Sequence, residues 1–106
     1  MTAERIILLC AYYVETLKNR GIDPREANPK HTTTTSNRLA HVSWMCHQIV
    51  KMLDEDHGGG AREKPDRDLG FVQGVLWEHG VFSISEMRLH NKPHPRLPDT
   101  IERPTQ

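Results

Sequence analysis

Apolar residues recur at helical spacing in three separate segments of this sequence, and no other feature constrains the fold as strongly. The first segment spans residues 3–20, the second 37–54 and the third 65–79. No stretch shows the strict alternation of apolar and polar residues that is typical of strands. The sequence therefore predicts an all-α fold, a small bundle of three main helices with a short fourth helix ending near His90.

Residues that start and stop helices mark the ends of these segments. Thr2 is the expected N-cap of the first helix, and Gly21 follows the end of that helix. Ser36 or Asn37 is the expected cap of the second helix. Pro65 suits the first turn of the third helix, where its missing N–H has no helical partner. The three helices are therefore predicted from their ends as well as from their periodicity.

The stretches between and after the predicted helices are polar and rich in turn residues. Residues 22–36 contain proline, asparagine and a run of threonines without periodicity, which predicts a long loop after the first helix. Ser83 and Glu86 have the spacing of a capping box at the start of the fourth helix. Four prolines and few apolar residues predict an extended or disordered tail over residues 93–106. We therefore expect one helical domain over residues 1–92.

The charge of the chain is balanced, with 14 Lys and Arg residues against 14 Asp and Glu residues. Binding to nucleic acid draws much of its affinity from phosphate neutralisation by a basic excess, so we do not expect it here. The apolar run over residues 6–14 is too short to cross a membrane and lacks a signal-peptide cleavage site. Cys10 and Cys46 lie within apolar helical patterns, which predicts two buried thiols in a reducing, cytoplasmic compartment.

A domain of this size is marginally stable alone, and association is a common remedy. We therefore expect a homo-oligomer, with a dimer favoured. Leu8 and Tyr12 lie one turn apart on a second face of the first helix, and Trp44 lies on the polar face of the second. Aromatic residues are enriched at binding hot spots, so these three residues are the predicted interface. Coverage of the same residues by the long loop or the tail is an equally good explanation.

The third helix is predicted to be the central one, because apolar residues cover most of its circumference. These residues are Phe71 together with Leu69, Val72, Val75 and Leu76. Gly70 and Gly74 interrupt the pattern, and each costs about 1 kcal/mol in a helix relative to alanine. Close approach by the backbone of a neighbouring segment is the compensation that we expect.

Gln73 lies on the third helix between an apolar line and Trp77, so its amide is expected to be partly buried. A buried amide needs hydrogen-bond partners, and we favour a structural bond to a neighbouring helix or loop. The alternative is a pocket in which Gln73, Trp77 and His41 orient a small molecule, such as a nucleotide signal, near a subunit junction. We expect no cofactor, because no phosphate-binding loop or metal-ligand spacing is present.

Asp54, Asp56 and His57 form the one acidic cluster that carries ligands suited to a divalent cation. A metal-dependent hydrolase built on these residues is therefore a further alternative. Consecutive residues in a glycine-rich loop lack the defined spacing of a metal site, so we favour a solvated charge cluster. Cys46 and His47 are not a nucleophile and base, because adjacent helical residues point about 100° apart. We therefore do not expect an enzyme.

The third and fourth helices resemble a known group of proteins. Residues 69–77 read L-G-F-V-Q-G-V-L-W, and Gly80 and the segment S-I-S-E-M-R-L-H-N follow. This half resembles the C-terminal half of small bacteriophage-encoded accessory proteins of unassigned role. The earlier T-S-N-R-L-A-H-V-S-W-M-C resembles their threonine–serine lead into a helix that contains Trp-Met-Cys. Asp68 differs, because an aromatic residue is commoner at that position. The resemblance covers about half of the chain and brings no activity with it.

What the resemblance implies is a biological context. Small phage accessory proteins often bind a host component, and some inhibit bacterial defence systems. We therefore expect a non-enzymatic accessory protein that binds a host protein in the host cytoplasm. An oligomeric nucleotide-binding protein and a metal-dependent hydrolase stay open as alternatives.

Overall fold

The computed structural model describes residues 1–30, 34–55 and 62–92. Within these residues the chain forms four helices and no strand. The helices are α1 (Ala3–Asn19), α2 (Thr35–Glu55), α3 (Glu63–Glu78) and α4 (Ile84–His90). The predicted all-α fold with three main helices and a short fourth helix is confirmed. The predicted tail, residues 93–106, lies outside the described residues.

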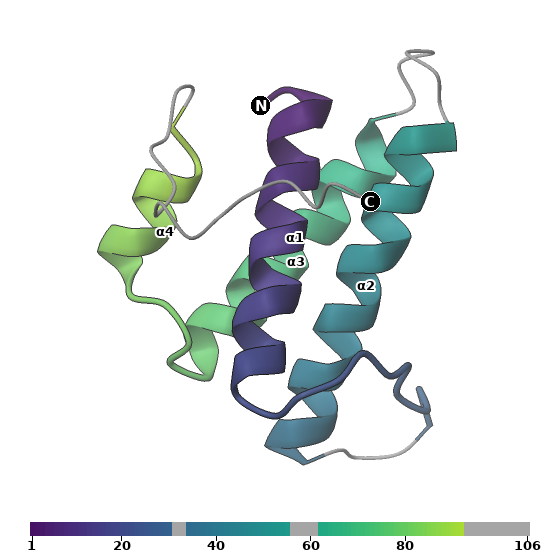
Figure 1. Ribbon diagram of the computed structural model, residues 1–106, viewed down its shortest axis with the longest axis vertical. Helices are drawn as coiled ribbons and strands as arrows, with labels where there is room; N and C mark the ends of the chain where they lie inside the picture. The colour runs from purple at the N-terminus through teal and green to yellow at the C-terminus, as the bar shows by residue number, and fades with distance from the viewer. Residues whose placement is uncertain (31–33, 56–61, 93–106) are drawn as a thin grey trace.

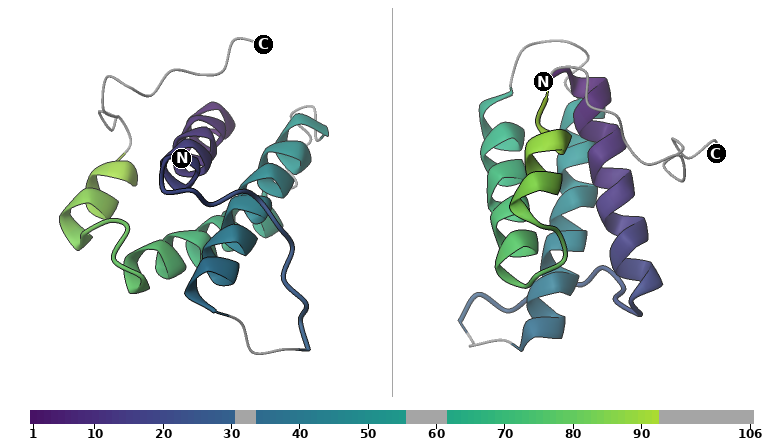
Figure 2. Two further views of the ribbon diagram at one scale, coloured as in Figure 1. Left: turned by 60° about the horizontal axis from the view of Figure 1, so that its bottom comes forward. Right: turned by 90° about the vertical axis from the view of Figure 1, so that its left-hand side faces the viewer.

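The helix α2 is the common packing partner of α1 and α3. A short turn after α3 leads into α4, which lies on the opposite side of α1 from α2 (Figure 1). The end-on view in Figure 2 shows α1 with α2 on one side, α4 on the other and α3 beneath. One side of α3 therefore faces the bundle and its other side faces away from it.

The core is built from the apolar faces that the periodicity predicts. All four helices and the turn before α4 contribute buried side chains. They include Ile6, Leu9, Tyr13, Leu17, Leu39, Val42, Ile49, Leu53, Leu69, Val72, Leu76, Phe82 and Met87. Cys10 and Cys46 are also fully buried, and both thiols are free, as predicted. Among the described residues, no helix has the combination of length and apolarity needed to cross a membrane.

The ends of α1 have the predicted caps. The Thr2 hydroxyl accepts a hydrogen bond from the Arg5 backbone N–H at 3.1 Å. At the other end Gly21 has a φ of 80°, which favours glycine, and the Ile22 N–H donates to the Leu17 carbonyl. Both helix ends therefore satisfy backbone groups that helix geometry leaves without partners.

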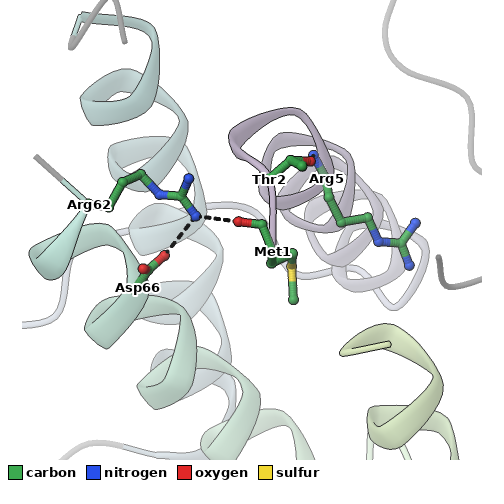
Figure 3. Close-up of polar contacts among 5 residues, drawn as sticks. All are labelled: Met1, Thr2, Arg5, Arg62 and Asp66. Carbon is green, nitrogen blue, oxygen red and sulfur yellow. Dashed lines mark hydrogen bonds and ion pairs between the residues drawn. The ribbon is translucent and has the colours of Figure 1, made fainter. Parts of the chain in front are cut away.

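The first residue of the chain is also tied to the start of α3. Arg62 Nη2 donates to the Met1 carbonyl at 2.6 Å and lies 3.1 Å from an Asp66 carboxylate oxygen (Figure 3). The Arg5 side chain extends from α1 away from this contact (Figure 3). Its Nε and Nη2 atoms are buried without a hydrogen-bond partner, and burial lowers the pKa of its guanidinium group.

The helix α2 begins earlier than the sequence analysis predicted. Its first residue is Thr35, and Thr34 Oγ1 accepts the Asn37 backbone N–H at 3.2 Å. The threonine before the helix therefore provides the cap, and Ser36 and Asn37 already lie within the first turn.

The helix α3 also begins earlier than the sequence predicts, at Glu63 rather than at Pro65. Proline fits the third helical position for the same reason that it fits the first, since neither N–H has a helical acceptor. The fourth helix follows its prediction closely. Ser83 Oγ accepts the Glu86 N–H at 3.1 Å, and the Glu86 carboxylate accepts the Ser83 N–H at 2.9 Å, so the capping box is confirmed.

Candidate interaction surface

The outer side of α3 exposes two large aromatic side chains. Phe71 is 55% exposed and Trp77 is 49% exposed, although both belong to the apolar pattern of the helix. The prediction that α3 is the central helix is therefore wrong, since α2 is the helix that packs against both α1 and α3. Only Pro65, Leu69, Val72 and Leu76 are buried, because α2 covers one side of the helix and no described segment covers the opposite side.

Gly70 and Gly74 lie between these aromatic side chains and face open space. A Cβ atom built on either glycine meets nothing within 4 Å. The close backbone approach that the sequence analysis expected is therefore absent among the described residues. The two glycines still weaken the helix, by about 1 kcal/mol each relative to alanine, and no contact described here compensates for that cost.

The geometry of α3 makes these four residues one surface, which we call the α3 outer face. At about 100° per residue, Gly70 and Gly74 lie on the side of the helix opposite its buried residues. Trp77 lies on one flank of the glycines and Phe71 on the other, about 120° apart around the axis. The α3 outer face therefore has two glycines at its centre and an aromatic residue on each flank.

Two charged side chains continue the α3 outer face toward its ends. Arg67 precedes the glycines and Glu78 follows them, and both are exposed. Within the described part of the chain, neither forms an ion pair; the two ion pairs of α3 are those of Arg62 with Asp66 and of Lys64 with Asp68. The face therefore offers an apolar centre, one cation and one anion to a partner.

The predicted interface residues Leu8 and Tyr12 are half-buried on α1. The Tyr12 ring packs against Phe82 and His90, with ring centroids 5.5 and 5.6 Å apart. The second face of α1 is thus covered in large part by the turn before α4 and by α4 itself. Burial and the nearby Glu86 carboxylate raise the pKa of the Tyr12 hydroxyl.

Trp44, the third predicted interface residue, lies on α2 far along the chain from Tyr12 and is half-buried. Its ring stacks on His41, one helical turn earlier, with centroids 5.4 Å apart and planes inclined by 25°. The loop after α1 reaches the same place, because the Ala27 N–H donates to His41 Nδ1 at 3.1 Å. Trp44 therefore has a partner within its own helix.

Gln73 makes the structural hydrogen bond that we favoured. Its Nε2 donates to the Tyr13 hydroxyl at 3.0 Å and to Asn91 Oδ1 at 2.9 Å. The Tyr13 hydroxyl lies 2.8 Å from His90 Nδ1 and 3.9 Å from the Met87 sulfur. One buried hydroxyl thus joins α1, α3 and α4, and this polar cluster stabilises the position of the short helix.

Burial decides the protonation of this cluster. Desolvation raises the pKa of Tyr13, so the phenol stays neutral. Desolvation also lowers the pKa of His90, and the Arg5 charge acts in the same direction while Glu86 opposes it. Because Gln73 donates to the Tyr13 oxygen, we assign the phenol hydrogen to His90 Nδ1, which places the ring hydrogen on Nε2.

The residues of the predicted small-molecule pocket lie in two places. Gln73 faces Tyr13 and Asn91, and Trp77 lies on the adjacent flank of α3. His41 instead lines a cavity of about 330 Å³ between α2 and α3, on the Phe71 side of α3. Val42, Val75 and His79 also line this cavity. The histidine is therefore separated from the other two residues by α3.

Of the predicted metal cluster, the structure describes only Asp54, which is exposed near the end of α2. Asp56 and His57 lie outside the described residues. Within the described ranges there is no group of three or more His, Cys, Asp or Glu side chains that could hold a metal ion.

Sequence reasoning missed the α3 outer face because it assigned Phe71 to the core and explained both glycines by contacts within the chain. The available signal was the combination of two glycines one turn apart with aromatic residues on both flanks. Comparison of the chain with family models, curated proteins and solved structures finds no match.

Proposed function

We propose that this chain is a non-enzymatic helical protein that acts by protein–protein binding, and that the α3 outer face is its contact surface. The observation that carries the proposal is the exposure of Phe71 and Trp77 on either side of two open glycines. Aromatic side chains are the residues that contribute most to binding hot spots. Two glycines without Cβ atoms let a partner helix approach closely, because interhelical distance depends on the side chains at the contact.

The α3 outer face is a better contact surface than the one formed by the predicted interface residues Leu8, Tyr12 and Trp44. Tyr12 and Trp44 already have ring partners within the chain, whereas Phe71 and Trp77 are about half exposed. Leu8, Tyr12 and Trp44 remain a predicted second contact region on the other elements. Aromatic side chains whose rings already pack within the chain have less surface left to desolvate on association than Phe71 and Trp77 have.

Site-specific photo-crosslinking in cells that express the protein tests the proposal. A benzophenone amino acid at position 71 or 77 should give covalent products heavier than the free chain after irradiation. The same amino acid at position 89 is the matched control, because Leu89 is an apolar residue of similar exposure on α4. Equal product yields at positions 71, 77 and 89, or no product at any of them, would contradict the proposal.

The resemblance to phage accessory proteins indicates the kind of partner to expect. On that basis we propose that the chain works in the cytoplasm of a bacterial host and that a host protein, in a defence system, is its target, bound through the second contact region of Leu8, Tyr12 and Trp44. Mass spectrometry of the products cross-linked through a benzophenone amino acid at position 44 tests this step. Peptides of a single host protein should recur, and products that contain only this chain would leave the host target without support.

A second candidate function is the binding of a small molecule in the cavity beside His41. The cavity volume of about 330 Å³ falls at the lower end of ligand pockets, and apolar side chains of Val42 and Val75 form part of its wall. The Ala27 N–H occupies His41 Nδ1, which leaves the Nε2–H as the donor of that ring.

Thermal unfolding with a panel of nucleotides, including cyclic dinucleotides, tests this second function. A ligand present at 100 times its dissociation constant adds about 2.7 kcal/mol to the free energy of unfolding. The variant Val75→Trp is the control, because the larger side chain would fill the cavity. A shift that persists in this variant, or no shift with any nucleotide, would count against the cavity.

A further inference from the structure

We infer that a second copy of this chain binds the α3 outer face, with the two α3 helices antiparallel. This inference rests on the proposed function and names the partner of the same surface. The order of residues along α3 (Glu63–Glu78) and their charges support it.

The α3 outer face has the spacing of a helix–helix seam. Arg67, Gly70, Gly74 and Trp77 follow one another at intervals of three, four and three residues. Alternating steps of three and four residues keep a line of side chains on one side of a helix, as in the a and d positions of coiled coils. The face is therefore a line to which a second helix can pack along several turns.

The seam is symmetric about Val72, the residue midway between the glycines. In an antiparallel pair centred on this residue, Gly70 of each copy faces Gly74 of the other. Backbone can then meet backbone at the centre, which residues with a Cβ would prevent at the shortest interaxial distances. The open glycines thereby gain a contact that offsets their cost in the isolated helix.

The charges select the antiparallel arrangement over the parallel one. Arg67 lies five residues before Val72 and Glu78 lies six residues after it, on nearly the same side of the helix. Antiparallel pairing therefore places Arg67 of one copy beside Glu78 of the second copy, and does so twice. Parallel pairing would place Arg67 beside Arg67 and Glu78 beside Glu78, which is repulsive.

The aromatic flanks fit the same symmetry. A two-fold axis perpendicular to antiparallel helices brings the same flank of each helix together. Phe71 lies one residue from Val72, so the two Phe71 rings meet close to the axis. Trp77 of one copy lies level with Arg67 of the second copy, where its ring can receive the guanidinium group.

Disulfide cross-linking between two variants, each with one added surface cysteine, tests the arrangement. Purified Arg67→Cys and Glu78→Cys chains are mixed and oxidised, and a covalent dimer that joins position 67 to position 78 is expected. Either variant alone should give little dimer, because two copies of position 67 would lie about 15 Å apart along the antiparallel helices. Cys10 and Cys46 are fully buried, so the unmodified chain provides the background.

Charge exchange provides an independent test on the folded, full-length chain. Arg67→Glu and Glu78→Arg should each weaken dimerisation about tenfold, since each turns two attractive pairs repulsive. The double variant should restore dimerisation to within about threefold of the original. Lys51→Glu, an exposed charge reversal on α2, should have no such effect.

Each outcome decides a separate point. Efficient self-cross-linking of Arg67→Cys would show a parallel pair and overturn the antiparallel arrangement. A chain that stays monomeric at all concentrations and gives no mixed disulfide would overturn the second copy as partner. If photo-crosslinks from positions 71 and 77 then lead to a different protein, the proposed function stands although this inference fails.

Discussion

The hydroxyl of Tyr13 on α1 lies 2.8 Å from Nδ1 of His90 on α4, and both side chains are buried. The two residues are 77 positions apart, and the same hydroxyl accepts a hydrogen bond from Gln73 on α3. The helix α4 has only seven residues and cannot be stable alone. Its position therefore depends on this polar contact together with the apolar contacts of Phe82 and Met87.

Removal of the Tyr13 hydroxyl should destabilise the fold. Tyr13→Phe keeps the ring but leaves the buried His90 Nδ1 and one Gln73 N–H without this partner. We expect a loss of about 1–3 kcal/mol in the free energy of unfolding, measured by urea denaturation. Tyr12→Phe is the control, because that half-buried ring should lose less than about 0.5 kcal/mol. Equal losses in the two variants would refute the assigned role of the Tyr13 hydroxyl.

The stability of the fold should decrease as the solution becomes mildly acidic. Burial lowers the pKa of His90 in the folded chain below its ordinary value of 6.5. The unfolded chain therefore binds a proton first, so the stability from neutral His90 is complete above pH 6.5. It falls as the pH drops from there toward the folded pKa.

Urea denaturation between pH 8 and pH 5 checks this dependence. In His90→Gln the histidine contribution to the pH dependence should disappear, although the variant itself is less stable. His47→Gln, a change at an exposed position of α2, is the matched control. A pH dependence that is unchanged in His90→Gln would exclude His90 as its source.

A methyl group at Gly70 should stabilise the single chain. A Cβ at this position meets nothing within 4 Å, and alanine favours the helix over glycine by about 0.5–1 kcal/mol. Gly70→Ala should therefore raise the free energy of unfolding by up to about 1 kcal/mol, measured in dilute solution where association is negligible. Gly21→Ala should have the opposite sign, because Gly21 has a φ of 80°. Destabilisation by Gly70→Ala in the dilute chain would mean that the outer face is packed.

The thiols of Cys10 and Cys46 should be unreactive in the folded chain. The two thiols form a hydrogen bond with each other that raises the pKa of Cys46, and burial acts in the same direction. Since the thiolate is the reactive form, a disulfide reagent should modify both cysteines rapidly in denaturant and slowly in native buffer. Rapid modification in native buffer would show that the groove between α1 and α2, which borders both residues, opens readily.

Much of this fold follows from local sequence. The periodicity predicted the three main helices, and the capping box of Ser83 and Glu86 predicted the fourth. The N-cap Thr2 also acts as expected. The start of α2 was missed because several of its residues can cap a helix, and the choice of Thr34 depends on backbone geometry. Periodicity and capping residues therefore predict the helices, and the ends of these helices agree with the structure to within about two residues.

The candidate site was less accessible to sequence reasoning, because it depends on which faces meet. A helical wheel shows that Phe71 is one of many apolar residues of α3, but not that α2 covers only the opposite side. Tyr12 is the opposite case. The helical wheel places it outside the main apolar face, but Phe82 and α4 cover its ring in the structure. These contacts join residues far apart in the chain, which periodicity does not report.

The most direct test of the α3 outer face is the solution mass as a function of concentration. Light scattering during size exclusion should give a mass that rises from 12.2 kDa toward twice that value as the concentration increases. The variant Gly70→Gln/Gly74→Gln should remain at its monomer mass with its helicity retained, because glutamine favours helices but places side chains on the α3 outer face. A variant that dimerises as well as the original chain would contradict the proposed pairing of α3 helices, and so would an original chain that is monomeric throughout.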